Sequence, residues 1–236
     1  MGSYDTIIRN AQVVTPEGIR SLDVALSGGQ IAALLAPGQG VAATTIDASG
    51  QHVLPGAIDI HFHIRAPAHP ERGTVESETR AAAAGGITTL FEMPISKPCC
   101  NTAERVEMRQ RHFADHAFIN FAIFGAPGDL EPASIAAMAD AGAIAFKMFT
   151  TTAPEGRDDE FQGLSFPDEA DQMRALKAVA SSGLPLVVHA ESAQLLALGE
   201  QSIAGMDLAD TDTHLLARPA MCEAVAVAKL LTMNIE

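Results

Sequence analysis

The sequence predicts an α/β fold, a TIM-like (β/α)8 barrel preceded by a small β module. From residue 57 onward, apolar segments of strand length alternate with helical segments, which is typical of a parallel sheet. Ligand-type side chains stand where several of these strands end, as they do in barrels. No Gly-x-Gly-x-x-Gly and no phosphate loop follows any strand, which removes the usual reason to expect a doubly wound sheet.

Residues 1–55 are predicted to form the β module, a partial β-sandwich. Gly28-Gly29 and Pro37-Gly38 are typical turn sequences that divide this region. Between such breaks, strand-like stretches occupy residues 4–9, 11–15, 22–27 and 30–35, and a further one leads to Val53.

Residues 56–236 are predicted to form the N-terminal part of the barrel. The expected strands are residues 57–63, 87–93, 117–124, 143–149 and 185–190. The expected helices are residues 75–84, 102–113, 132–141, 167–181 and 218–232. Five parallel strands cannot close a barrel and would leave two edges unpaired. We therefore expect the chain to be incomplete.

Composition narrows the class of protein. A hydrophobic content of 47% is enough for a substantial core, and a formal charge of −14 without a basic run repels nucleic acid and anionic membranes. We expect neither as a partner. Three cysteines without CxxC spacing fit a reducing compartment. The N-terminus lacks a basic segment followed by an apolar one, so we expect a cytoplasmic protein.

The motif His61-Phe62-His63 closes the first strand of the predicted barrel. Alternate side chains of a strand lie on one face, so the two imidazoles would stand about 7 Å apart and could bind one metal ion. Asp59 falls on the same face. It would either orient a metal ligand or have a structural role at the floor of the barrel.

Two later strands also carry chemically useful residues. Lys147 is the single charge in Ala-Ile-Ala-Phe-Lys-Met-Phe, and desolvation lowers the pKa of an amine. A neutral lysine could act as nucleophile, base or, after reaction with carbon dioxide, a carboxylate-like metal bridge. Alternatively, its tip meets a substrate anion or a neighbouring carboxylate. His189 ends Leu-Pro-Leu-Val-Val-His, as a metal ligand or as a hydrogen-bonded core histidine.

Together, these motifs resemble the cyclic amidohydrolases, the family of dihydroorotase, allantoinase and dihydropyrimidinase (hydantoinase). The resemblance runs from the β module to the end of the chain, which looks like the N-terminal part of such an enzyme. It is carried by residues 55–63, 79–89, 93–94, 146–149 and 188–191.

The resemblance implies a centre of two divalent metal ions, most often zinc. His61 and His63 would hold the more buried ion, carbamylated Lys147 would bridge both, and His189 would bind the second. A metal-bridging hydroxide would open the C–N amide bond of a small cyclic amide or ureide. Family members add a sixth-strand histidine and a general-base aspartate, both expected beyond Glu236. The full-length form is expected to be a homo-oligomer.

Two positions bear on the substrate. Arg65 matches the position at which dihydroorotases bind the substrate carboxylate; the alternative is a solvent-facing loop arginine. Dihydroorotases carry asparagine directly after the Met-Pro pair, whereas Ile95-Ser96 follow Met93-Pro94 here. We expect Ser96 to contact the substrate. This departure disfavours dihydroorotase. Residues 161–167 and the Met-Pro-Ile-Ser loop resemble allantoinases somewhat more, but allantoinases usually lack an arginine at the position of Arg65. The ring that is opened stays undetermined.

Three other interpretations remain open. The first is a non-catalytic assembly protein on the same scaffold, like the dihydropyrimidinase-related proteins, although those have lost metal ligands and all four checkable positions are filled here. The second is an inactive truncated fragment. The third, a mononuclear deaminase of the same superfamily, needs no bridging lysine.

Overall fold

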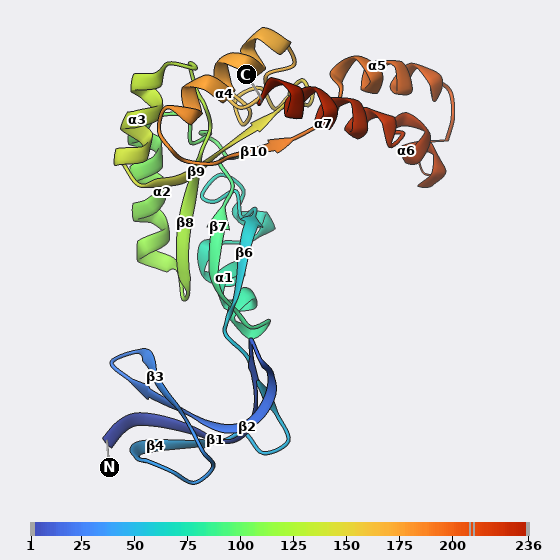
Figure 1. Ribbon diagram of the computed structural model, residues 1–236. Coiled ribbons are helices and arrows are strands. Elements are labelled where there is room, and N and C mark those ends of the chain that lie inside the picture. The colour runs from blue at the N-terminus through green and yellow to red at the C-terminus, as the bar shows by residue number, and fades with distance from the viewer. Residues whose placement is uncertain (1–2, 208, 210, 235–236) are drawn as a thin grey trace. The chain divides into compact units, whose positions relative to one another are not determined.

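The computed structural model describes residues 3–207, 209 and 211–234 (Figure 1). The chain divides into two compact units, Met1–Gly56 and Ala57–Glu236. Each unit contains one five-stranded sheet. Among the described residues, no helix is both long and apolar enough to cross a membrane.

The sheet of the first unit is mixed. Its strands are β1 (Ser3–Thr15), β2 (Gly18–Ser27), β3 (Gln30–Leu35), β4 (Val41–Asp47) and β5 (His52–Val53). They are ordered β3-β2-β1-β4, and β5 also pairs with β1. β1 is antiparallel to β2 but parallel to β4 and β5. A small core of Ala11, Val13, Val24 and Ala48 lies against this sheet.

The first unit differs from the sequence prediction in two ways. The stretches 4–9 and 11–15 form one strand, β1, with a bulge at Asn10, where φ is +61°. The buried carboxylate of Asp23 accepts hydrogen bonds from the Asn10 amide at 2.9 Å and from Arg9 at 2.8 Å, which holds the bulge. β4 was not predicted, because it is exposed along most of its length and lacks the alternation of a half-buried strand.

The second unit is built on a parallel sheet, as predicted. Its strands are β6 (Ala57–Phe62), β7 (Ile87–Glu92), β8 (Asn120–Gly125), β9 (Ala143–Phe149) and β10 (Leu186–His189). They follow one another in sequence order across the sheet, and each neighbouring pair is parallel. The expected fold class, an incomplete parallel barrel together with a separate β module, is confirmed.

Helices between the strands pack against the sheet (Figure 1). They are α1 (Val75–Ala84), α2 (Ala103–His116), α3 (Pro132–Asp140) and α4 (Glu169–Ala180), with a short 3-10 helix, η1 (Pro70–Arg72), before α1. Thr74, Thr102 and Asp168 cap α1, α2 and α4 by accepting hydrogen bonds from backbone amides of the first turn. The main core includes Leu90, Val106, Phe113, Ile123 and Phe146.

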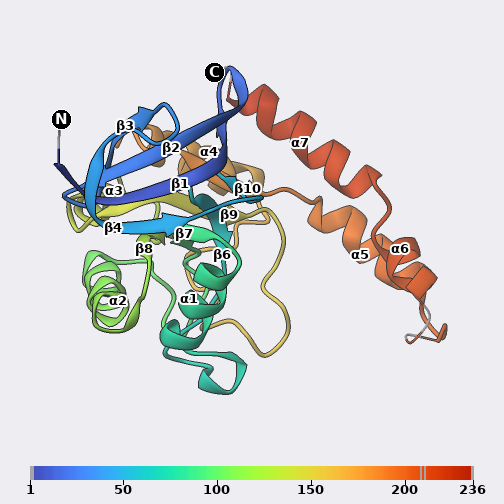
Figure 2. The ribbon, with the colours of Figure 1, turned by 90° about the horizontal axis from the view of Figure 1, so that it is seen from below.

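Three helices follow β10: α5 (Ala193–Ser202), α6 (Thr211–Ala217) and α7 (Met221–Met233). α5 and α6 extend away from the parallel sheet in both views, whereas α7 returns toward it, and its Leu230 packs against the cluster of Met148, Phe166 and Ala175 (Figures 1 and 2). Only α7 was predicted. α5 contains Gly199, a poor helix former that makes its pattern hard to recognise. That glycine has a packing reason, because an added Cβ would lie 2.0 Å from the Ala217 carbonyl oxygen.

Candidate metal centre at the carboxyl ends of the parallel strands

His61 and His63 lie where β6 ends. His61 is within the strand and His63 directly follows it, and their ring centroids are 5.1 Å apart. Burial is the main cause that lowers the pKa of both imidazoles, with a further contribution from the charge of Lys147. The pKa of His63 falls to about 4. Both rings are therefore neutral near pH 7, the form in which histidine binds metal ions.

Lys147 lies in β9 and is only 2% exposed. Burial lowers its pKa to about 8, and among the described residues no carboxylate is found to offset that effect. Its Nζ lies 5.0 Å from the centroid of the Phe149 ring. Its charge lowers the pKa of both His61 and His63, although two strands of the sheet separate β9 from β6.

His189 is the last residue of β10. Its ring stacks on Phe149 with 4.7 Å between centroids, and its Nε2 lies 2.6 Å from the Glu191 carboxylate. Glu191 also accepts hydrogen bonds of 3.0 and 2.8 Å from Arg218. All four predicted ligands therefore lie at or near the carboxyl ends of parallel strands of one sheet.

The four predicted ligands suit a divalent cation only in part. Two neutral imidazoles side by side are a common half of a zinc site. Within the described ranges, however, no three His, Cys, Asp or Glu side chains are placed to hold a metal ion together. Nε2 of His189 is engaged by Glu191, and a lysine becomes a metal ligand only after its charge is removed. The further ligands are therefore not gathered around the two imidazoles in the described part of the chain.

Asp59 acts on the backbone of β6. Its carboxylate accepts a hydrogen bond of 2.9 Å from the His61 amide. The pairing of β6 with β7 changes register between Asp59 and Phe62, which is where this side-chain contact forms. Its negative charge also opposes the lowering of the pKa of His61 and His63.

Arg65 lies beside a carboxylate of its own chain. Its Nη1 is 3.7 Å from Glu160, which also pairs with Arg157 and, at 3.2 Å, with His69. Glu160 is only 7% exposed, so this cluster ties the loop after β6 to the loop after β9. His69 thus also belongs to the cluster.

Ser96 is fully buried. Its hydroxyl lies 3.2 Å from the carbonyl oxygen of Arg65 and 3.4 Å from that of Ala66. The serine that was expected to contact substrate thus supports the segment that follows His63.

A cavity of about 620 Å³ adjoins His189 and is large enough for a small ring. Phe149 and Phe161 form apolar parts of its wall, and Glu191 and Arg218 supply charge. The cavity therefore joins the ends of β9 and β10 to the helices that follow.

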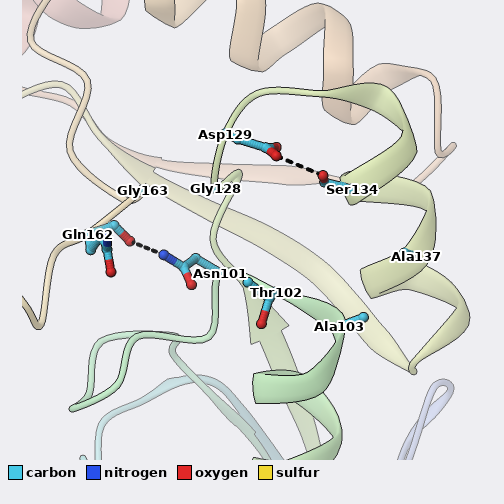
Figure 3. Close-up of a pocket in the computed structure, with 9 residues that line it drawn as sticks. All are labelled: Asn101, Thr102, Ala103, Gly128, Asp129, Ser134, Ala137, Gln162 and Gly163. Carbon is cyan, nitrogen blue, oxygen red and sulfur yellow. Dashed lines mark hydrogen bonds between the residues drawn. The ribbon is translucent and has the colours of Figure 1, made fainter.

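A second cavity of about 440 Å³ lies at the start of α2 and α3 (Figure 3). Its polar groups bond to one another: the Asn101 side-chain amide donates to the Gln162 backbone carbonyl at 2.8 Å, and the Ser134 hydroxyl donates to the Asp129 carboxylate at 2.9 Å. None of the predicted site residues lines it. This cavity is therefore distinct from the predicted metal centre.

Sequence reasoning missed Glu92 and Arg109. Glu92 ends β7, is fully buried and accepts hydrogen bonds from the amides of Ile64 and Arg65. Burial raises its pKa to about 7, against the opposing effect of Arg109. A single charge at the end of the apolar stretch Ile-Thr-Thr-Leu-Phe-Glu is the same pattern that identified Lys147, and it could have identified Glu92 too.

Comparison with known proteins defines the class. Residues 50–234 match the Dihydro-orotase-like family, and the chain belongs to that family. It is 32% identical over 234 residues to an allantoinase of Desulfitobacterium hafniense, covering 98% of this chain and 51% of that protein. It is 30% identical over 237 residues to an L-hydantoinase of Paenarthrobacter aurescens, covering 99% and 50%.

Solved structures agree with this assignment. An L-hydantoinase (dihydropyrimidinase) from Arthrobacter aurescens superposes with a TM-score of 0.88 at 28% identity, covering 98% of this chain and 51% of that one. A D-hydantoinase gives 0.80 at 26% identity, covering 97% and 49%. The chain spans about half the length of the curated relatives it matches.

Proposed function

We propose that this chain contributes the N-terminal part of the active site of a hydrolase that opens the C–N amide bond of a cyclic amide or ureide. The main support is that His61, His63, Lys147 and His189 lie at or near the carboxyl ends of parallel strands of one sheet. Relatives named allantoinase and L-hydantoinase, at 30–35% identity, favour rings of the allantoin or hydantoin type.

The proposed cofactor is a pair of divalent metal ions, with zinc favoured by the imidazole donors. His61 and His63 would hold one ion, carbamylated Lys147 would face both, and His189 would hold the other. When bound, such ions polarise an amide carbonyl and lower the pKa of a water molecule, which makes it a nucleophile near neutral pH.

Lys147 is suited to carbamylation because its pKa is about 8. Near that pH about half of the lysine is neutral, and only the neutral amine reacts with carbon dioxide. Nζ forms a bond to the carbon atom and loses one proton, which leaves an anionic carbamate. The lysine thereby changes from a cation that repels metal ions into an oxygen ligand that attracts them.

Arg65 bears on which ring is accepted. In the chain as described, Glu160 lies beside its guanidinium at 3.7 Å, so the arginine is already paired. This favours a ring without a carboxylate. A carboxylate-bearing ring of the dihydroorotate type is the second candidate, because the same guanidinium would bind it if Glu160 moved away.

The test uses the longest natural gene product that contains this chain, loaded with zinc. We expect it to open allantoin, hydantoin or dihydrouracil and to act more slowly on dihydroorotate, as measured by chromatography of the ring-opened products. Turnover of no ring would contradict the proposal and favour the non-catalytic scaffold or the inactive fragment. Preferred turnover of dihydroorotate would favour the second candidate.

A further inference from the structure

The segment that leaves β6 is held by a buried carboxylate. Glu92, the last residue of β7, is 0% exposed. It accepts hydrogen bonds of 3.0 and 3.2 Å from the Ile64 amide and of 3.1 Å from the Arg65 amide. These are the first two residues after His63. One carboxylate thus satisfies two successive backbone donors directly beside a predicted metal ligand.

The backbone conformation explains why an anion is needed at this point. Arg65 has φ +60°, and such a reversal directs consecutive amides into one concave site that suits an anion. On the other side of His63, the Met93 amide donates to the Phe62 carbonyl oxygen at 2.8 Å. The backbone of His63 is therefore fixed on both sides by the end of β7.

Arg109 of α2 supplies the countercharge. It is 1% exposed, and its Nη1 lies 3.5 Å from Glu92. Nε and Nη1 of Arg109 have no hydrogen-bond partner among the described residues. Arg109 therefore interacts with Glu92 mainly through its positive charge. Buried ion pairs are often replaceable by apolar residues without loss of stability. Stability alone therefore does not explain the ion pair of Glu92 with Arg109.

We propose that Glu92 is a positioning residue, which fixes the segment after β6 so that His61 and His63 are held in the orientation that binds a cation. This inference rests on the metal role proposed for the two histidines. Glu92 itself touches neither the cation nor the substrate, and Arg109 keeps its carboxylate in place.

The first test compares Glu92→Gln with the double variant Glu92→Gln/Arg109→Met. The neutral side chain of Glu92→Gln would lack the charge that two amides require, and Arg109 would be left as an unpaired buried cation. The double variant removes that cation, so it should recover stability toward urea. We expect Zn²⁺ and Co²⁺ affinity, measured at pH 8 by competition with a chelator, to fall roughly 10- to 100-fold in both variants.

The control is Ala175→Gly, a change in α4 and in a separate hydrophobic cluster, which lowers stability without altering the cluster that contains the segment after β6. Its cation affinity should stay at the wild-type value, and Glu92→Asp should restore part of the affinity lost in Glu92→Gln. Affinity that follows stability, and so returns to the wild-type value in the double variant, would overturn the inference.

A second measurement needs no metal. In the wild-type chain, the Ile64 and Arg65 amides should exchange slowly with solvent, and nuclear Overhauser effects should connect the His61 and His63 rings. Both features should be lost in Glu92→Gln and kept in Ala175→Gly. If they persist in Glu92→Gln, the inference fails. If only cation binding by the wild-type protein is absent, the proposed metal centre fails instead.

Discussion

Lys147 is a buried amine, and in the described part of the chain it forms no ion pair. Its Nζ contacts the face of an aromatic ring, and burial alone shifts its pKa to about 8. A cation kept in such a place costs free energy unless it is neutralised or converted. This property links the residue to the chemistry proposed for it.

Replacing Lys147 by alanine should abolish turnover in the longest natural gene product. We expect a loss on the order of 10⁴-fold in kcat, because the variant lacks the anionic group that brings the two cations together. Short carboxylic acids should restore part of the activity by occupying the space left by the side chain. Lys177→Ala, an exposed change on α4, is the matched control. Unchanged turnover in Lys147→Ala would leave the lysine only a structural role.

Glu92 and His63 should give opposite pH dependences of stability. The pKa of Glu92 rises from 4.5 to about 7 on folding, so the folded state binds more protons than the unfolded state between these pH values. The contribution of Glu92 to the free energy of unfolding is therefore lost as pH rises from 4.5 to 7. The pKa of His63 falls from 6.5 to about 4, so its contribution is lost as pH falls.

Comparing the wild type with Glu92→Gln separates the effect of Glu92 from that of His63. From pH 4.5 to 7, the free energy of unfolding of the wild type minus that of Glu92→Gln should fall by about 3 kcal/mol. Urea unfolding at a series of pH values measures it. A difference that stays constant or grows with pH would show that Glu92 is ionised throughout.

At the scale of the element, the bulge in β1 depends on one carboxylate. Asp23 is 0% exposed and accepts hydrogen bonds from Arg9, from the Asn10 amide and, at 2.8 Å, from the Gly38 amide. Asp23→Ala leaves these donors unpaired and should destabilise the first unit by about 3 kcal/mol. Thermal unfolding measures the loss, with the exposed turn residue Glu17→Ala as control. A loss no larger than that of Glu17→Ala would contradict this account.

The contact between α5 and α6 depends on Gly199. An alanine there would place its Cβ 2.0 Å from the Ala217 carbonyl oxygen, so the helices must separate. We expect a destabilisation of about 1–3 kcal/mol together with faster amide exchange in α5 and α6. Leu198→Ala, at a 61% exposed position on the same helix, should change neither. Unaltered exchange in Gly199→Ala would disprove close packing at this point.

At the scale of the whole molecule, the parallel sheet has free edges. Within the described residues, β6 and β10 each have a neighbour on one side only. Ile58 and Ile60 of β6 are 60% and 62% exposed. Such edges and apolar side chains favour pairing with other chains.

The isolated 24.7 kDa chain should therefore self-associate and bind a hydrophobic dye. Light scattering measures self-association, and fluorescence measures dye binding. Ile60→Thr should reduce both properties. Ile144→Thr, at a 38% exposed position in the interior strand β9, should have a smaller effect. A monodisperse monomer that unfolds cooperatively would refute the expectation that the chain is incomplete. The homo-oligomeric state of the full-length form stays a prediction.

The sequence alone determined the alternation of strands and helices in the second unit, because apolar periodicity and turn residues are local properties. It also identified His61, His63, Lys147 and His189 as candidate ligands, since each is a polar residue at or near the end of an apolar strand. α5 and β4 were missed because a packing glycine and an exposed strand carry no such local pattern.

Only the tertiary structure decided which residues surround those candidates. Glu92 meets the Ile64 and Arg65 amides, and Glu160 meets Arg65, across 28, 27 and 95 positions of sequence respectively. Nothing near a residue in the sequence specifies a partner so distant, because the partner is chosen by the order and curvature of the strands. The sequence therefore determined which side chains could do chemistry, and the fold decided what holds them in place.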